Sequence, residues 1–248
     1  MNIIFYKTKL VDGFYFMTQR ILSIETGTEF CSIALSQDEQ IMSRFIGVPR
    51  QHSLSILPMI DALLAEAQVS LKMLDAIAVG KGPGSFTGVR LGISVAQGLC
   101  FGLDLPCIPI SSLEILAYGA KEEAHKRGIT LLVPVMDARM KEVYVGAYKL
   151  EENRLIGLIE DSVAKPHEIK KIIFQHQDSQ DSIAIGTGWH EYEKELMEST
   201  GLHPVLIFPQ ATPQAQDLAK LAAIAMKEGR VCKPQECIPA YCRNKVTF

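Results

Sequence analysis

The segment at residues 81–88 (KGPGSFTG) has the composition of a ligand-binding turn. It follows an apolar, strand-like run at residues 75–80 and precedes a helix that we predict from about residue 85 to residue 102. A glycine-rich turn in this position exposes backbone N–H groups at the positive end of the helix dipole, where phosphate groups bind. The turn residues that could contact a phosphate are Gly82, Gly84 and Ser85.

The amino-acid sequence of this turn does not match a known phosphate-binding pattern. It is neither GxxxxGKS/T nor GxGxxG. Its glycines equally suit tight turn angles and close backbone packing. We therefore interpret residues 81–88 as a structural turn and expect no cofactor, while a bound nucleotide stays open as an alternative.

The helix after the turn is rich in small residues, which recur at every fourth position along two ridges: Gly88, Gly92 and Ala96 on one, and Ser94, Gly98 and Gly102 on the other. Each glycine costs a helix roughly 1 kcal/mol relative to alanine. Close packing against another helix would offset that cost, because small residues let two backbones approach. The helix predicted at residues 52–67 also has more apolar surface than one buried face needs.

Two further turns follow strand-like runs that end in an acidic residue, at residues 25–28 and 137–141. In actin-like ATPases two such turns hold the nucleotide phosphates, and glycines let the backbone come close. The second turn here (DARMK) contains no glycine, so we expect Arg139 and Met140 to fill the phosphate position. This argues against ATP turnover.

Other catalytic patterns are missing from the sequence. Its six histidines form no HxxxH or HExxH pair, and no serine lies in a GxSxG context. His52 begins a helix and suits a capping or interface role. The six cysteines form no CxxC pair, which favours buried, reduced thiols over disulfides or a zinc site.

Composition and element order indicate an α/β protein with two lobes. The chain has 248 residues, enough for two fused lobes, and a net charge of −3, so no global basic field attracts nucleic acid. Each half opens with a strand, an acidic residue, a turn and a second strand, and then alternates strands with helices. No run is long and apolar enough for us to predict a membrane span.

The first 19 residues do not fit the pattern of the remainder. A clean strand pattern begins only at Arg20, so we interpret residues 1–19 as a non-native or disordered extension. Met17 is then the expected natural start, with Met1 as the alternative.

Several strings in the chain resemble the TsaB (YeaZ) family. The most specific are GPGSFTGVR and DARMKEVY, and RQHSLSILPMIDALL, IPISSLEILA, GTGW and PAYCRNKV also match. The resemblance covers about Arg20 to Val246. Departures are few: the family usually has Asp at Glu25, Ser at Gly27 and Leu at Cys242.

This resemblance implies an α/β, actin-like ATPase (ASKHA) fold of two related lobes, each with a mixed sheet and flanking helices. We place the lobes at residues 20–116 and 117–248, with the C-terminal helix or tail packing back on the first. It also implies a non-catalytic cytoplasmic subunit required to form N6-threonylcarbamoyladenosine at position 37 of tRNAs that read codons starting with A. Ser112 and Leu116 match the positions where the transferase TsaD carries its metal-binding histidines.

The resemblance also implies the partners of the chain. They are TsaD in a heterodimer, the ATPase TsaE, a second copy of the chain when TsaD is absent, and tRNA indirectly through the complex; no membrane is involved. The expected interface lies on the helices at about residues 52–66 and 85–101, at His52, Ile56, Leu57, Ile60, Leu64, Val89, Gly92, Ile93, Ala96 and Leu99.

Two other readings remain open at this point. One is a glycoprotease-like or nucleotide-binding enzyme of the same superfamily. The other is a homodimer with an unrelated function.

Overall fold

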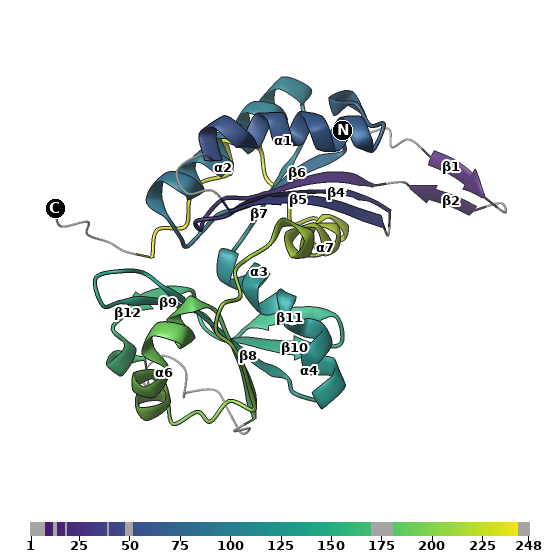
Figure 1. The fold of residues 1–248 in the computed structure, drawn as a ribbon. Helices are drawn as coiled ribbons and strands as arrows, with labels where there is room; N and C mark the ends of the chain where they lie inside the picture. Colours follow the sequence, from purple (N-terminus) through teal and green to yellow (C-terminus); the bar gives the residue numbers. More distant parts are fainter. Residues whose placement is uncertain are drawn as a thin grey trace.

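The structure is a computed structural model that describes residues 8–11, 14–17, 19–38, 40–47, 52–169 and 181–242. It has two lobes, each built on a mixed sheet with helices on both sides (Figure 1). Met1 lies outside the described residues.

The first lobe is a five-stranded sheet in the order β5-β4-β3-β6-β7. β3 pairs antiparallel with β4 and parallel with β6, so the sheet starts as a meander and continues through helical crossovers. Its elements are β3 Arg20–Glu25, β4 Cys31–Gln37, β5 Gln40–Ile46, α1 His52–Glu66, η1 Leu71–Met73, β6 Ala76–Gly80, α2 Phe86–Leu103 and β7 Cys107–Ile110.

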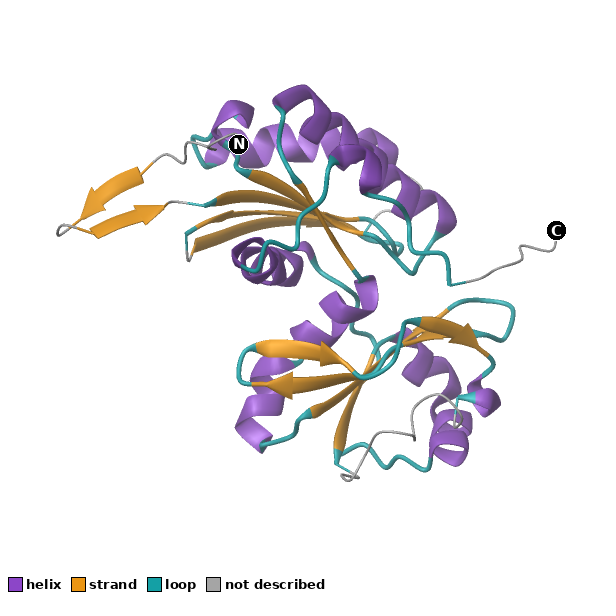
Figure 2. Ribbon diagram, turned by 180° about the vertical axis from the view of Figure 1, so that it is seen from behind, coloured by secondary structure: helices purple, strands orange, loops and turns teal. Residues whose placement is uncertain are grey.

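Both faces of this sheet are covered, which explains why β6 is apolar throughout. α1 and α2 lie on one face, and α7 (Ala215–Lys227) lies on the other (Figure 2). The first residue of α7 is anchored there, because the Ala215 N–H donates to Ser32 Oγ at 3.0 Å. The last helix of the chain therefore completes the core of the first lobe.

The second lobe repeats the scheme with parallel strands β8, β13 and β14 and antiparallel partners. Trp189 is fully buried in this lobe and its Nε1–H donates to Val133 O at 2.9 Å. The elements are α3 Ser112–Gly119, α4 Lys121–Arg127, β8 Leu131–Asp137, β9 Val143–Val145, β10 Tyr148–Glu151, β11 Arg154–Gly157, β12 Ser162–Ala164, η2 Pro166–Glu168, β13 Ser182–Ile185, α6 Thr187–Thr200 and β14 Leu206–Phe208. η4 Pro234–Glu236 follows α7 and packs against α2 of the first lobe.

α2 corrects one sequence expectation. Among the described residues it is the one helix whose length and composition suit a membrane span, although we predicted no such run. It begins at Ser85, whose Oγ accepts from the Gly88 N–H at 3.4 Å, and ends at Asp104 in the left-handed region. Its inner side packs on the sheet, and that packing accounts for much of its apolar character.

The structure also bears on the predicted segment limits. Within residues 1–19, β1 (Thr8–Val11) and β2 (Phe14–Met17) form an antiparallel hairpin of their own, so the described part of this extension is not unstructured. The boundary expected at residues 116/117 falls inside α3. The division into lobes at that point stays a prediction.

Candidate functional site

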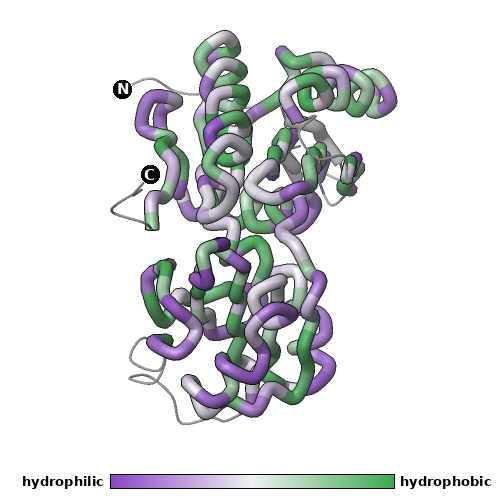
Figure 3. The backbone as a smooth tube through the Cα atoms, turned by 60° about the vertical axis from the view of Figure 1, so that its left-hand side comes forward, coloured by the Kyte–Doolittle hydropathy of each residue, from purple (hydrophilic) through white to green (hydrophobic). Residues whose placement is uncertain are grey.

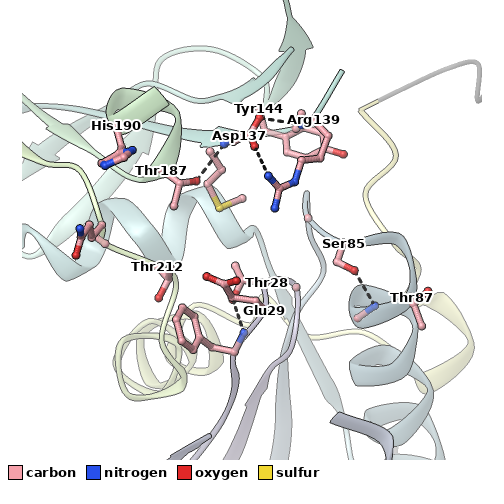
Figure 4. A pocket seen from close by; sticks show the side chains of 18 of the residues that line it. Thr28, Glu29, Ser85, Thr87, Asp137, Arg139, Tyr144, Thr187, His190 and Thr212 are labelled. Carbon is pink, nitrogen blue, oxygen red and sulfur yellow. Dashed lines mark hydrogen bonds and ion pairs between the residues drawn. The ribbon is translucent and has the colours of Figure 1, made fainter. Parts of the chain in front are cut away.

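A cleft of about 860 Å³ lies between the two lobes. Figure 4 shows hydroxyl groups facing it from both lobes, with Thr28 and Ser85 on one side and Thr187 on the other. Its lining residues come from six segments: residues 27–30, residues 52–53, the start of α2 (84–85, 87–88 and 91), residues 136–139 with Tyr144, the start of α6 (187, 190 and 191), and residues 209–212.

Two backbone donors of the glycine-rich turn that lie at the start of α2 are used within the protein. The Ser85 N–H donates to Gly27 O at 2.6 Å, and the Gly88 N–H is taken by the Ser85 side chain. A Cβ on Gly84 would collide with Gly27 O, and one on Gly88 would collide with Thr26 O. These glycines therefore let the turn and α2 pack tightly against the first hairpin turn, which favours the structural interpretation.

Of the three candidate phosphate contacts, Gly84 and Ser85 line the cleft. Gly82 does not line it; its φ of +90° sets the turn, and it is buried beside Val89. A phosphate role for Gly84 and Ser85 stays a prediction.

The second turn is open, contrary to expectation. Arg139, Met140 and Lys141 all have positive φ values, of 61°, 56° and 60°. This left-handed run is rare for residues with side chains. It directs Arg139 and Met140 outward, with 86% and 72% of their surface exposed. The expectation fails for Met140, which is not among the residues that line the cleft. Arg139 does line it, and its place at the phosphate position stays a prediction.

The charges around the cleft do not favour an anion. Three carboxylates line it, from Glu29, Asp137 and Glu191, against the single guanidinium of Arg139. Arg139 Nη1 lies 3.1 Å from Asp137 Oδ2, so much of its charge is already neutralised. A polyphosphate would therefore meet unpaired acidic groups.

Glu25 is a functional candidate whose environment the sequence did not reveal. It ends β3, is 1% exposed, and accepts hydrogen bonds from the Gly27 N–H at 2.6 Å and from Ser112 Oγ at 3.0 Å. Desolvation raises the pKa of this carboxyl to about 7, although its hydrogen bonds oppose the shift. The sequence signal that could have indicated this buried carboxyl is an acidic residue at the end of an apolar strand.

Ser112 and Leu116, which the sequence resemblance matches to metal-ligand positions of TsaD, both lie in the interior of the structure. Ser112 begins α3 and donates to Glu25, while Leu116 is 2% exposed and packs in the second-lobe core. Within the described ranges, no group of three or more His, Cys, Asp or Glu side chains is arranged to hold a metal ion.

The structure corrects the residues expected at the partner interface. Seven of them are buried in the first-lobe core, so their side chains do not reach the surface of the chain: Ile56, Ile60, Leu64, Val89, Gly92, Ile93 and Ala96. The physical reason is that the regular apolar stripe of each helix faces the sheet. The apolar residues of these helices that do not belong to the stripe are the ones exposed on the surface.

The remaining expected residues lie nearer the surface. Leu57 is 52% exposed and Leu99 is half-buried. His52 is half-buried, lines the cleft, and its Nε2 has no hydrogen-bond partner among the described residues. Figure 3 colours the backbone by hydropathy and shows hydrophobic and hydrophilic stretches in both lobes.

The outer sides of α1 and α2 carry exposed apolar and small residues, and we call this set of positions the outer helix face. Leu54 and Phe101 are 76% and 84% exposed. A Cβ on Gly98 or Gly102 would meet nothing within 4 Å. We define the outer helix face as Leu54, Leu57, Ser94, Gly98, Phe101 and Gly102.

Comparisons with known proteins agree with this architecture. The model of a family described as TsaD, tRNA N6-adenosine threonylcarbamoyltransferase, matches residues 30–245. The tRNA threonylcarbamoyladenosine biosynthesis protein TsaB of Escherichia coli K12 is 38% identical over 234 residues, which cover 92% of this chain and 96% of that protein. Its namesake in Haemophilus influenzae is 37% identical over 240 residues, covering 92% and 95%.

A solved structure described as YeaZ from Pseudomonas aeruginosa has 36% identity and a TM-score of 0.79, covering 90% of this chain and 99% of that one. This likeness and the two mixed sheets with flanking helices confirm the predicted actin-like ATPase (ASKHA) fold. Because full-length relatives and the fold both agree with the sequence resemblance, this chain belongs to the TsaB (YeaZ) family.

Proposed function

We propose that this chain is a non-catalytic subunit that binds and activates TsaD, together with TsaE, to form N6-threonylcarbamoyladenosine at position 37 of tRNAs reading codons that start with A. Family membership supports the broader role in tRNA threonylcarbamoyladenosine biosynthesis. The single observation that carries the binding role is the outer helix face, which this chain leaves uncovered.

The non-catalytic role is supported by what stands at the matched metal positions. Ser112 uses its hydroxyl on a buried carboxyl, and Leu116 has no ligand atom. The cleft between the lobes adds carboxylates rather than cations. A phosphoryl or carbamoyl transfer site would need cationic or metal stabilisation of the developing negative charge.

The binding role is supported by the shape of the outer helix face. Gly98 and Gly102 expose helix backbone on α2, so a partner helix can approach closely beside Phe101 and Leu57. Large exposed apolar side chains grouped around small residues are typical of protein interfaces. The same face would serve a second copy of this chain when TsaD is absent.

The test is a charge placed on this face without damage to the core. Gly98→Glu adds a carboxylate where a side chain has open space, so the chain should fold normally. We expect it to lose co-elution with TsaD on size exclusion and to lose tRNA modification when it replaces the native subunit in an assay with TsaD and TsaE. His125→Glu adds the same charge to an exposed position of α4 and serves as the control.

A Gly98→Glu variant that binds TsaD fully and supports modification would refute the interface. Modification that proceeds with the subunit omitted would refute the activating role.

A further inference from the structure

The C-terminal segment forms a strap along the first lobe. We define the C-terminal strap as residues 230–242, which leave α7 and run beside β7 and α2 (Figure 1). Gln97 Nε2 on α2 donates to Pro234 O at 3.1 Å and to Cys237 O at 2.9 Å. The Ala240 N–H donates to Lys81 O at 2.8 Å. These non-covalent contacts hold the strap in place.

Four cysteines that are distant in sequence meet under this strap. Cys100 comes from the end of α2, Cys107 from the start of β7, and Cys232 and Cys237 from the strap. The Cys107 thiol contacts the other three, and Cys232 also contacts Cys237. All four are free thiols; Cys232 is half-buried and the other three are buried.

The backbone fixes the distance between Cys107 and Cys232. Each donates its N–H to the carbonyl of the other, at 3.0 and 2.9 Å, so they form a hydrogen-bonded antiparallel pair. Directly opposed residues of this kind have Cα atoms about 5.5 Å apart and side chains on one face. A disulfide spans Cα separations of about 4.4–6.8 Å, so the Cα spacing of this pair suits a bridge. Because the Cβ atoms of a hydrogen-bonded pair lie about 5.5 Å apart and a disulfide needs about 3.5–4.5 Å, the two segments must draw slightly together to close it.

We propose that this cluster is a thiol–disulfide site: under oxidising conditions Cys107 forms a disulfide with the strap, with Cys232 as its first partner. Cys237 contacts both thiols and can take the place of Cys232 by exchange. The described residues contain no group arranged to hold a metal ion, which favours the disulfide over a metal–thiolate site.

A low-molecular-weight disulfide supplies the oxidising equivalents. The Cys232 thiolate attacks one of its sulfur atoms, forms a mixed disulfide and releases one small thiol. The Cys107 thiolate then attacks the Cys232 sulfur and expels the second small thiol. Two cysteine thiols lose their protons and are oxidised, and the small disulfide is reduced to two thiols.

The four thiols are expected to react slowly with oxidants at neutral pH. Burial, followed by the neighbouring Cys237 and Glu236, raises the pKa of Cys232 to about 11, and contact with Cys100 raises the pKa of Cys107. Thiolates are therefore scarce at neutral pH, and the reaction is slow. Cys232 is the most accessible of the four, which makes it the entry point.

Closing this bond joins the strap covalently to the edge of the first-lobe sheet. The disulfide would enclose the chain from β7 to the end of α7, a loop long enough to restrict the unfolded chain strongly. We expect the thermal midpoint to rise by up to about 10 °C in the oxidised protein.

In the experiment, the full chain is treated with oxidised glutathione and then denatured in the presence of a thiol-blocking reagent. The number of blocked cysteines gives the number of thiols that remained free. The reduced chain has six thiols, so one disulfide leaves four (6 − 2 = 4). Peptide mapping without reduction should join Cys107 to Cys232 or to Cys237. Cys31→Ser, in a separate part of the core, should still lose two thiols.

Two separate cysteine variants are tested, so that the result does not depend on one variant that fails to fold. Cys107→Ser should form no disulfide within the chain and lose at most one thiol, as a glutathione adduct on Cys232, while Cys232→Ser, at the half-buried position, should form the bond far more slowly. Four outcomes would overturn the proposal: six thiols left in the treated parent chain, a disulfide confined to Cys232 and Cys237, one confined to Cys100 and Cys107, or glutathione adducts alone.

Discussion

The Glu25 carboxyl joins the first hairpin turn to the start of α3. Its two oxygens accept from the Gly27 backbone and the Ser112 hydroxyl, and a Cβ on Gly80 would collide with it. Three residues from separate segments thus form one pocket around a single buried acid. Because no salt bridge compensates the burial, the protonated form is favoured in the folded state.

Glu25 should make the stability of this chain fall as pH rises. Its pKa is 4.5 when unfolded and about 7 when folded, so the folded state binds a proton that the unfolded state has lost. The stabilising contribution is complete below pH 4.5 and disappears as pH rises to about 7, a difference of about 3 kcal/mol. Glu25→Gln keeps the shape and removes the titration.

Urea unfolding of the parent and the Glu25→Gln variant across this pH window measures the effect. The variant should match the parent in acid and exceed its unfolding free energy above pH 7. A constant difference between the two proteins at every pH would show that Glu25 does not titrate in this way.

The two helices of the first lobe show how far sequence patterns reach. Apolar periodicity placed α1 and α2 close to their observed limits, and the excess apolar surface indicated an exposed face. It could not say which face. The stripe with the most regular helical spacing, from Ile56 to Leu64, packs in the core. A helix that lies on a sheet buries residues that recur with the helical period, so these residues face the sheet.

Sequence patterns along one segment could not predict features that depend on contacts between distant segments. The four thiols come from residues up to 137 positions apart (237 − 100 = 137), and none has a spacing that suggests contact. The open second turn depends on three successive left-handed residues, which local preferences disfavour. Only the folded chain shows these arrangements.

The two glycine ridges of α2 should respond oppositely to alanine. Gly98→Ala places a methyl group in open space and should stabilise the chain by about 0.5–1 kcal/mol, because alanine is the better helix former. Gly92→Ala puts its Cβ 2.5 Å from Thr26 Oγ1 and should destabilise it by about 1–3 kcal/mol. Chemical denaturation of both variants checks the signs.

Equal effects at the two positions would mean that the ridges do not differ in packing. If Gly98→Ala also weakens binding to TsaD while stabilising the chain, the glycine is retained for contact rather than for folding.

At the scale of the whole molecule, the chain has a cleft between its two lobes. Two lobes face each other across it, and α7 and the C-terminal strap return from the second lobe to the first. The N–H groups of Ser85 and Gly88 are used internally, and the lining of the cleft is acidic. These features predict the behaviour of the isolated chain towards nucleotides.

Isothermal titration of the isolated chain with magnesium-ATP should give no binding in the submillimolar range. The carboxylates of Glu29 and Glu191 would repel the triphosphate, and Arg139 is occupied by Asp137. Submillimolar binding accompanied by hydrolysis would instead support the alternative of a nucleotide-binding enzyme.

Self-association should use the same surface as binding to TsaD. Without its partner, the chain has Leu54, Leu57 and Phe101 exposed on the outer helix face, and a two-fold contact would bury them against their own copies. Light scattering should therefore show a dimer that TsaD converts into a heterodimer, and Gly98→Glu should stay monomeric in both conditions. A Gly98→Glu dimer would place self-association on another surface, and a dimer that persists within the TsaD complex would show that the two partners do not compete.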